Sequence, residues 1–305
     1  MLRPNLILPA GLLLAGLTAP SARDHSTSII ISLDDWPLTS CAQIRVSFDG
    51  ASAERTQRAE SELTIPLAEL DRFEATAPEH GGVHVVAWDR PEWSVKLCKA
   101  VGGRDAERAA SQLARIELVR EGRMRVTGPD EDVPWAAYLI VRAPRAAAVD
   151  LRASAGSTAV HGLSGRVQLH SENGPISLDA CDGEIDAATV NGPLQFSGGA
   201  GRVALRTANG PIQVELEGVA WKTGALEVRT QNGPLSLKLS AAYRSGVRLD
   251  SSQHAPFACG QSCDQVRTSW SENGRRLELG AGTPAVRLST VNGPVSIETR
   301  ASRLL

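Results

Sequence analysis

The chain has 305 residues, of which 42% are hydrophobic and 4% aromatic, and a formal net charge of -2 at pH 7. The apolar fraction is enough to build one large or two average domains, which excludes a disordered chain. The charged residues are scattered without a basic block or an acidic tail. The composition therefore gives no support for a nucleic-acid partner.

Residues 1–23 have the pattern of a secretory signal peptide. An early arginine precedes a short apolar stretch, and a small-residue cleavage site follows at residues 19–21. The stretch is too short for a typical membrane span, although an uncleaved N-terminal anchor is the alternative and would be the one contact with a membrane. No cysteine follows it, which argues against a lipoprotein. We expect an exported protein, periplasmic rather than surface-displayed or secreted, because no sorting signal or late apolar tail is seen.

Two regions are expected after the signal. Residues 24–70 are predicted to form a β-rich N-terminal cap, and residues 71–300 a β-solenoid. Phe73–Trp88 shows a strand, a glycine corner and a second strand, which predicts an early coil. Asp105–Leu113 is predicted to form a short helix, and residues 116–126 a hairpin around Glu121-Gly122.

A phrase of the form Ser/Thr-x-Asn-Gly-Pro recurs between residues 148 and 300. Its predicted structural corners are Asn173, Asn191, Asn209, Asn232, Asn292 and, in a copy without proline, Asn273. With degenerate copies near 155 and 253, the steps are 18 to 23 residues, a period typical of solenoids. Apolar residues alternate on both sides of each corner, which predicts strands. We therefore predict an all-β, single-chain β-solenoid with two strands per coil of about 18 to 23 residues, an irregular cap and one short helix.

Each residue of the corner has an expected role. The asparagine has the parity of the inward residues, so we expect it to point into the coil and to bond the asparagines above and below. Glycine would supply backbone freedom, and proline would fix φ where the next strand begins. The alternative is that each Asn-Gly closes an ordinary hairpin, but the matching flanks favour stacked coils. The apolar phase slips after Asn273, which predicts a bulge there.

Five cysteines in an exported chain permit two disulfides and one remaining thiol. The closely spaced Cys259 and Cys263 are the first candidate pair. Cys41 with Cys98 is the second, which would leave Cys181 free. Their spacing fits neither a metal site nor a thioredoxin-like redox motif, so no cofactor and no metal are expected.

Loops of unusual length cluster at the second corner of the later coils. In a solenoid such insertions emerge along one edge and can form a shared face. The candidate binding edge therefore comprises Trp221, Tyr243, His254 and Phe257. The alternative is that Trp221 and Tyr243 cover the side of the core, since aromatic rings are usually buried in part.

An enzyme is the less favoured class. A β-helix polysaccharide lyase or hydrolase needs acids and bases aligned across neighbouring coils. Here Asp179, Asp182, Glu184 and Asp186 form one acidic patch at a single corner, and no acid ladder continues from it. The six histidines show no metal spacing and no paired acid. No catalytic residue is therefore assigned.

Three sequence features occur in the order known from one bacterial family: Gly82-Val-His-Val-Val-Ala-Trp88-Asp89-Arg90-Pro91-Glu92, Tyr138-Leu-Ile-Val-Arg-Ala-Pro144 and the Asn-Gly-Pro coils. Over residues 70 to 300 the chain thus resembles the putative adhesin domain family of bacterial envelope proteins. The resemblance implies an exported β-solenoid from a family with no generally known enzyme activity and with no catalytic residues to transfer. Two features depart from the family: the proline after each Asn-Gly is unusually regular, and the first 70 residues lie outside the match.

The expected function is binding or adhesion. A solenoid offers a long, rigid surface for an envelope or extracellular polymer or protein, so an envelope glycan or protein is the expected partner. A rigid periplasmic scaffold without a specific ligand is the alternative.

Overall fold

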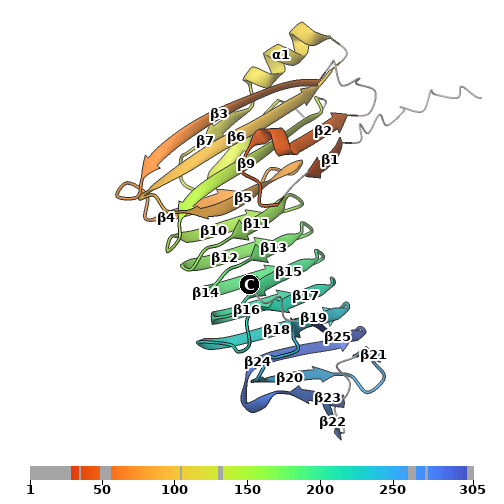
Figure 1. Ribbon diagram of the computed structural model, residues 1–305. Coiled ribbons are helices and arrows are strands. Elements are labelled where there is room, and N and C mark those ends of the chain that lie inside the picture. The colour runs from red at the N-terminus through yellow and green to blue at the C-terminus, as the bar shows by residue number, and fades with distance from the viewer. Residues whose placement is uncertain are drawn as a thin grey trace, which may run out of the picture.

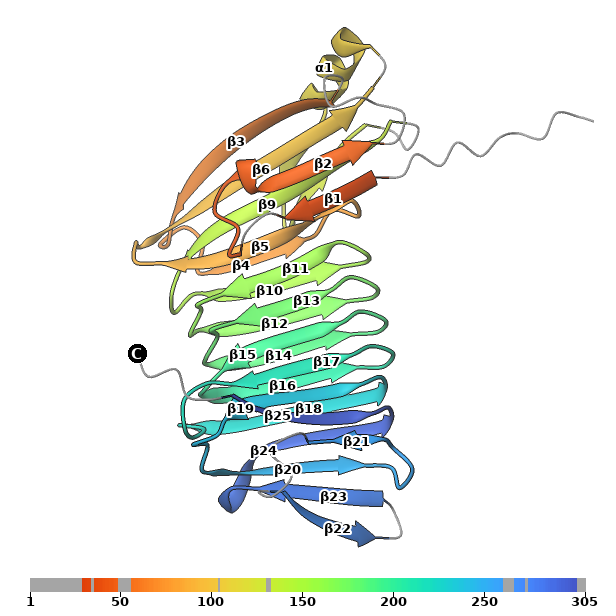
Figure 2. The same cartoon turned by 45° about the vertical axis from the view of Figure 1, so that its right-hand side comes forward.

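The computed structural model describes residues 29–33, 36–48, 56–103, 105–129, 133–259, 266–271 and 274–300. Within them the protein is all-β apart from one α-helix and a short 3-10 helix. Two large sheets face each other, and their strands follow one another along an elongated body (Figures 1 and 2). The predicted all-β class is confirmed.

Both sheets combine strands from the whole length of the described chain. Sheet 1 has the spatial order β22 (Arg267–Ser271), β23 (Gly274–Leu279), β20 (Ser245–Ser251), β24 (Ala281–Asn292), β18 (Gly224–Asn232), β16 (Gly201–Thr207), β14 (Glu184–Thr189), β12 (Arg166–Ser171), β10 (Ala148–Ala153), β4 (Arg72–Thr76), β8 (Met124–Thr127) and β7 (Glu117–Val119). Sheet 2 has the order β21 (Phe257–Ala258), β25 (Val295–Arg300), β19 (Leu235–Ser240), β17 (Ile212–Leu216), β15 (Leu194–Gly198), β13 (Ile176–Asp179), β11 (Ser157–His161), β5 (Gly81–Trp88), β9 (Trp135–Pro144), β6 (Glu92–Gly102) and β3 (Thr56–Pro66).

From β10 to β19 the chain alternates between the sheets, and each strand pairs in parallel with the strand two positions later. A strand of sheet 1 and the following strand of sheet 2 are called a strand pair below. Alternate residues of each strand point into the space between the two sheets. Within sheet 1, the inward residue Val203 lies in register with Ile185 on one neighbouring strand and Leu226 on the other. All three are buried, and fully burying such a side chain stabilises the fold by about 1.5–3 kcal/mol.

The corner differs from the prediction in which side chain points inward. Thr207, two residues before Asn209, is buried, whereas the asparagine is exposed. The predicted inward orientation of the asparagine is therefore wrong, because the turn begins directly after the threonine and ends the strand alternation. The buried hydroxyl bonds the backbone at the turn glycines, as between Gly192 N and Thr189 Oγ1 at 3.1 Å.

The glycines of the corners are required by close packing. A Cβ atom on Gly192 would lie 2.2 Å from the carbonyl oxygen of Gly174, and one on Gly210 would lie 2.2 Å from that of Gly192. These glycines do not have positive φ angles. Glycine was predicted here for its backbone freedom, but the structure requires it for its small size. The backbones of neighbouring strand pairs touch at this point, so a side chain would not fit.

The exposed asparagines form a continuous hydrogen-bonded ladder. Each Nδ2 donates to the Oδ1 of the previous asparagine at 2.8 to 3.0 Å, in the order Asn191 to Asn173, Asn209 to Asn191, Asn232 to Asn209 and Asn292 to Asn232. The predicted stacking of asparagines is present, but on the outside.

The order of the last strand pairs differs from the chain order. Pair β24/β25 lies between pair β18/β19 and pair β20/β21. Asn273 lies outside the described residues, but its flanking strands β22 and β23 are antiparallel and form a hairpin. The parallel coil predicted around Asn273 does not form, because this copy lacks the proline and has the wrong apolar phase. The register shift lies instead between Ser245 and Val247.

The N-terminal part continues the same sheets. Strands β4 and β5 pair in parallel with β10 and β11, as predicted for the early coil. The helix α1 (Ala106–Ala114) begins after Asp105, whose Oδ1 accepts the Arg108 N–H at 2.9 Å. Strands β7 and β8 form the predicted antiparallel hairpin.

An arm precedes sheet 2 in the chain and packs on its outer face. It comprises β1 (Ile29–Leu33), the 3-10 helix Cys41–Gln43 and β2 (Ile44–Phe48). Phe48 and Leu38 are buried in a small second core with Tyr138 of β9. The Cys41–Cys98 disulfide joins the arm to β6, as predicted, and Cys181 is a buried free thiol.

Two predictions cannot be followed within these ranges. Cys259 is disulfide-bonded, but its predicted partner Cys263 lies outside the described residues. The signal peptide predicted for residues 1–23 also lies outside them. Among the described helices none is long and apolar enough to cross a membrane.

Candidate functional site

The predicted binding edge is largely part of the core. Trp221 and Tyr243 are 6% and 8% exposed, and the Trp221 indole donates to the Gly201 carbonyl at 3.2 Å. Phe257 is half-buried beneath the Arg275 guanidinium, and His254 is exposed. The alternative prediction, that Trp221 and Tyr243 cover the side of the core, is therefore the one that the structure supports. Neither ring is available to a ligand.

A different site lies on the outer face of sheet 2. It is a groove with a volume of about 380 Å³ over strands β11, β13, β15 and β17. Parallel register places outward side chains of the same position in straight columns. One column consists of Ser177, Gln195 and Gln213, and the next of Asp179, Ser197 and Glu215. The groove therefore presents hydroxyl, amide and carboxylate groups, repeated from strand to strand.

Trp36 of the arm closes one end of this groove. Its ring is 40% exposed and its Nε1 donates to Asp179 Oδ2 at 3.2 Å. Edge-to-face contacts fix the ring, with centroid distances of 5.5 Å to His84 and 6.4 Å to His161. An aromatic platform thus stands beside a polar wall.

Asp179 is the electrostatic centre of the groove. Its carboxylate accepts hydrogen bonds from Ser197 Oγ at 2.6 Å and Trp36 Nε1, and it contacts His161 Nδ1 at 2.8 Å. Burial opposes ionisation, but the hydrogen bonds from Ser197, His161 and Trp36 outweigh it and lower the pKa of Asp179. The groove therefore holds a fixed negative charge at neutral pH.

His84 lies at the Trp36 end and is 2% exposed. Its Nε2 is 3.1 Å from Ser157 Oγ, whereas its Nδ1 is buried without a hydrogen-bond partner. Burial lowers the pKa of His84 to about 4, so the ring is neutral at pH 7. An unsatisfied buried polar atom is costly, so the burial of this nitrogen without a partner destabilises the fold.

Ser197, Asp179 and His161 do not form a nucleophile and base, and among the described residues the contact between Ser157 and His84 lacks an acid at His84 Nδ1. Asp179 lies between Ser197 and His161, so the serine hydroxyl donates to a carboxylate and has no imidazole to take its proton. The acidic patch predicted from sequence is also divided, because Asp186 lies on sheet 1 and accepts from Arg206 at 2.6 Å. In the described part of the chain no three His, Cys, Asp or Glu residues are placed to hold a metal.

Sequence reasoning missed Trp36 and His84 as groove residues. Trp36 lies in the segment predicted only as a β-rich cap, which carries no repeat. His84 was grouped with isolated histidines because its neighbours come from distant strands. A tryptophan in a segment without the repeat is the one signal that the sequence offers.

No protein-family model matches the chain, and no curated protein matches it significantly. Three solved structures are similar to it at low sequence identity. A putative cell adhesion protein from Clostridium sporogenes has 7% identity, covers 80% of this chain and 100% of its own, and has a TM-score of 0.34. A putative adhesin from Bacteroides fragilis has 11% identity, 80% and 97% coverage and a TM-score of 0.41. A putative lipid binding protein from Parabacteroides distasonis has 9% identity, 80% and 96% coverage and a TM-score of 0.32. A likeness of this degree identifies no ligand or activity for this chain.

Proposed function

We propose that the protein is an exported, non-enzymatic binding module that takes a neutral, hydroxyl-rich glycan chain in the groove beside Trp36. The observation that carries this proposal is the groove itself, with an exposed indole at one end and columns of Ser, Gln, Asp and Glu side chains along its floor. Amide and carboxylate groups bond sugar hydroxyls, and an aromatic face packs on the apolar face of a sugar ring.

The charge of the groove selects among polymers. Asp179 and Glu215 are its carboxylates, and the arginines of the strands lie mainly on sheet 1. A polyanion would be repelled, whereas a neutral glycan can donate hydroxyl hydrogen bonds to both acids. A neutral envelope glycan is therefore the proposed ligand.

The architecture suits an extended ligand. We propose that the strand pairs are the two-strand coils of a β-solenoid, since each pairs in parallel and in register with the next. Neighbouring strands lie about 4.8 Å apart, so equivalent side chains repeat along the rod axis. A linear polymer can meet the same groups several times.

Two further features support the wider proposal. Residues 1–23 resemble a secretory signal, and disulfides such as Cys41–Cys98 persist in oxidising compartments. Residence in the periplasm is proposed on this basis. The absence of enzymatic activity is proposed because Ser197 Oγ donates its hydrogen bond to the Asp179 carboxylate and not to His161, and because His84 Nδ1, in the histidine that contacts Ser157, has no acid among the described residues to orient it.

The test is a glycan and peptidoglycan binding screen with the full chain. Saturable binding that weakens about tenfold or more in Trp36→Ala would support the groove. Trp270→Ala is the matched control, because Trp270 is 63% exposed on β22 at the far end of sheet 1. Equal loss in both variants would contradict the proposal.

A rigid scaffold without a ligand is the second candidate. The asparagine ladder and the closely packed glycines favour it, because they make neighbouring strand pairs stiff against each other. Absence of binding to every neutral and envelope polymer in the screen would favour this function.

A further inference from the structure

The outer face of sheet 1 differs in charge from the groove on sheet 2. Along β4, β8, β10, β12, β14, β16 and β18, with the residue before β8, arginines outnumber carboxylates by eight to five. The arginines are Arg72, Arg123, Arg125, Arg152, Arg166, Arg202, Arg206 and Arg229, and the carboxylates are Glu74, Asp150, Glu184, Asp186 and Glu227. This face therefore carries a positive excess.

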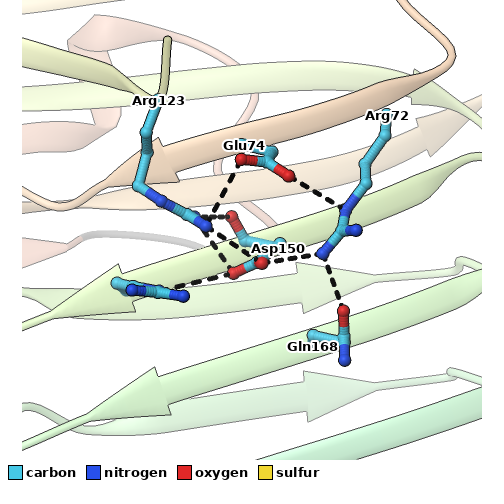
Figure 3. Close-up of polar contacts among 6 residues, drawn as sticks. Arg72, Glu74, Arg123, Asp150 and Gln168 are labelled. Atoms are coloured by element: carbon cyan, nitrogen blue, oxygen red, sulfur yellow. Dashed lines mark hydrogen bonds and ion pairs between the residues drawn. The ribbon is translucent and has the colours of Figure 1, made fainter.

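Three of these arginines, Arg72, Arg123 and Arg152, lie around Asp150, and two of them also contact Glu74. Arg72 Nη2 donates to Asp150 Oδ2 at 2.7 Å, and Arg123 donates to Oδ1 and Oδ2 at 3.0 Å each (Figure 3). Burial opposes ionisation of Asp150, but Arg123, Arg72 and Arg152 outweigh it and lower its pKa. Both carboxylate oxygens are thus occupied by two guanidinium groups.

Arg152 is left with little compensation. Its Nε is 3.9 Å from the same Asp150, and its side chain is 62% exposed. A weak, exposed ion pair at this distance contributes little. Arg152 is therefore a cation available to an external anion.

Arg152 begins a column of basic side chains along the rod. By strand register it is followed by His170, Ala188, Arg206 and Arg229. The short side chain of Ala188 leaves a hollow of about 520 Å³ between its basic neighbours. Two carboxylates also line the hollow: Asp150 is held by Arg72 and Arg123, and Asp186 pairs with Arg206 at 2.6 Å. The surplus positive charge of the hollow is therefore that of Arg152.

We propose that this basic column binds a linear acidic polysaccharide, with a carboxylate of the polymer in the hollow against Arg152. A planar guanidinium matches a carboxylate with two hydrogen bonds. The column runs from strand to strand in steps of about 4.8 Å, which fits a chain lying along the rod. A lipid surface fits less well, because binding to a bilayer uses apolar anchors, and the described residues of β10, β12, β14 and β16 show no exposed large hydrophobic side chain.

This second site is independent of the neutral-glycan groove. The basic column is on sheet 1 and the groove on sheet 2, so one rod could join two polymers. The experiment measures binding of polygalacturonate to the full chain at low and high salt, with neutral dextran and anionic phospholipid vesicles as comparison ligands. Salt should weaken polygalacturonate binding, because exposed charges are screened.

Three variants change the column and one double variant serves as the control. Arg152→Gln with Arg206→Gln should weaken polygalacturonate binding by about tenfold. Arg166→Gln with Arg287→Gln removes two exposed arginines from the same sheet outside the column and should weaken it much less. Ala188→Lys should tighten binding several-fold because it completes the column, and Ala188→Glu should weaken it.

Several outcomes would overturn the proposal. Equal loss in the two double variants would mean that net charge alone attracts the polymer. Binding to vesicles that equals or exceeds binding to polygalacturonate would mean that the ligand of the basic column is a lipid surface. Thermal melts of all variants check that the fold is kept. Trp36→Ala should leave polygalacturonate binding unchanged, so failure of one site is distinguishable from failure of the other.

Discussion

Asn292 donates a hydrogen bond from its Nδ2 to the Oδ1 of Asn232 at 2.9 Å, although the two residues are 60 positions apart. The chain between them makes strand pair β20/β21 and the β22–β23 hairpin, all at the end of the body (Figure 2). Strand pair β24/β25 then returns to stack on β18/β19. The described residues between 241 and 280 therefore have the position of an inserted terminal cap.

The first prediction concerns the glycine contacts. Gly192→Ala places a Cβ atom 2.2 Å from the Gly174 carbonyl oxygen, a backbone atom that cannot move without separating the strand pairs. We expect a loss of about 3 kcal/mol or more in the free energy of unfolding. Gly199→Ala is the control, since its nearest contact would be 3.2 Å away, and it should cost much less in urea denaturation. Similar losses in both variants would contradict the close-contact explanation.

The second prediction concerns pH. The folded-state pKa of His84 is lowered from 6.5 to about 4 by burial, so the unfolded chain binds the proton first as pH falls. Stability should therefore be full above pH 6.5 and decline toward pH 4, by about 3 kcal/mol for an isolated shift of this size. His84→Gln should flatten this part of the curve in urea denaturation. The exposed His170→Gln should leave the decline in place, and a decline unchanged in His84→Gln would assign it to other groups.

Much of the repeated region follows from the sequence, but its spatial order does not. The Ser/Thr-x-Asn-Gly-Pro phrase predicts strands, corners and asparagine stacking because each copy must fit its neighbour. Similarity between copies shows which units can stack, but not which units do. Asn232 thus lies beside Asn292, and the two strands that flank the copy without proline pair with each other as an antiparallel hairpin.

The candidate site was harder to predict for a different reason. Trp36 meets Asp179 and His84 only because the arm folds back onto sheet 2. No local pattern encodes such a contact between distant segments. Conversely, Trp221 and Tyr243 lie in insertions that look like surface loops, but their large apolar rings are more favourable when buried.

The third prediction concerns the arm. The Cys41–Cys98 disulfide closes a segment of 57 residues, and the chain-entropy model gives about 4 kcal/mol of stabilisation for such a loop. Cys41→Ser with Cys98→Ser should lower stability by up to this amount and weaken glycan binding, because the arm positions Trp36. Mild reduction of the full chain, which would also open the disulfide of Cys259, should weaken glycan binding in the same direction. Cys181 should remain unlabelled by a thiol reagent, because burial raises the pKa of its thiol to about 11. Unchanged glycan binding after reduction would show that the small core of the arm holds Trp36 in place without the disulfide.

The fourth prediction concerns the proposed cap. Replacing residues 241–280 by a Gly-Ser linker as long as the β17–β18 connection, residues 217–223, keeps the pairing of β24 with β18 and of β25 with β19. The replacement removes β20 and β21. The edges of β24 and β25 that face away from β18 and β19 then have no partner strand. Bare strand edges are templates for pairing with another chain. We therefore expect concentration-dependent dimers or larger assemblies by light scattering, whereas the full chain should assemble less.

A further substitution makes this prediction specific to the new edge. Ser289→Lys places a charge on the outer face of β24, and charged residues on edge strands oppose pairing between chains. Added to the linker variant, it should reduce assembly, while Ser236→Lys on β19 of the other sheet should reduce it less. Circular dichroism checks that the strands persist in each variant. A linker variant that is folded and no more associated than the full chain would show that residues 241–280 do not protect the end of the rod.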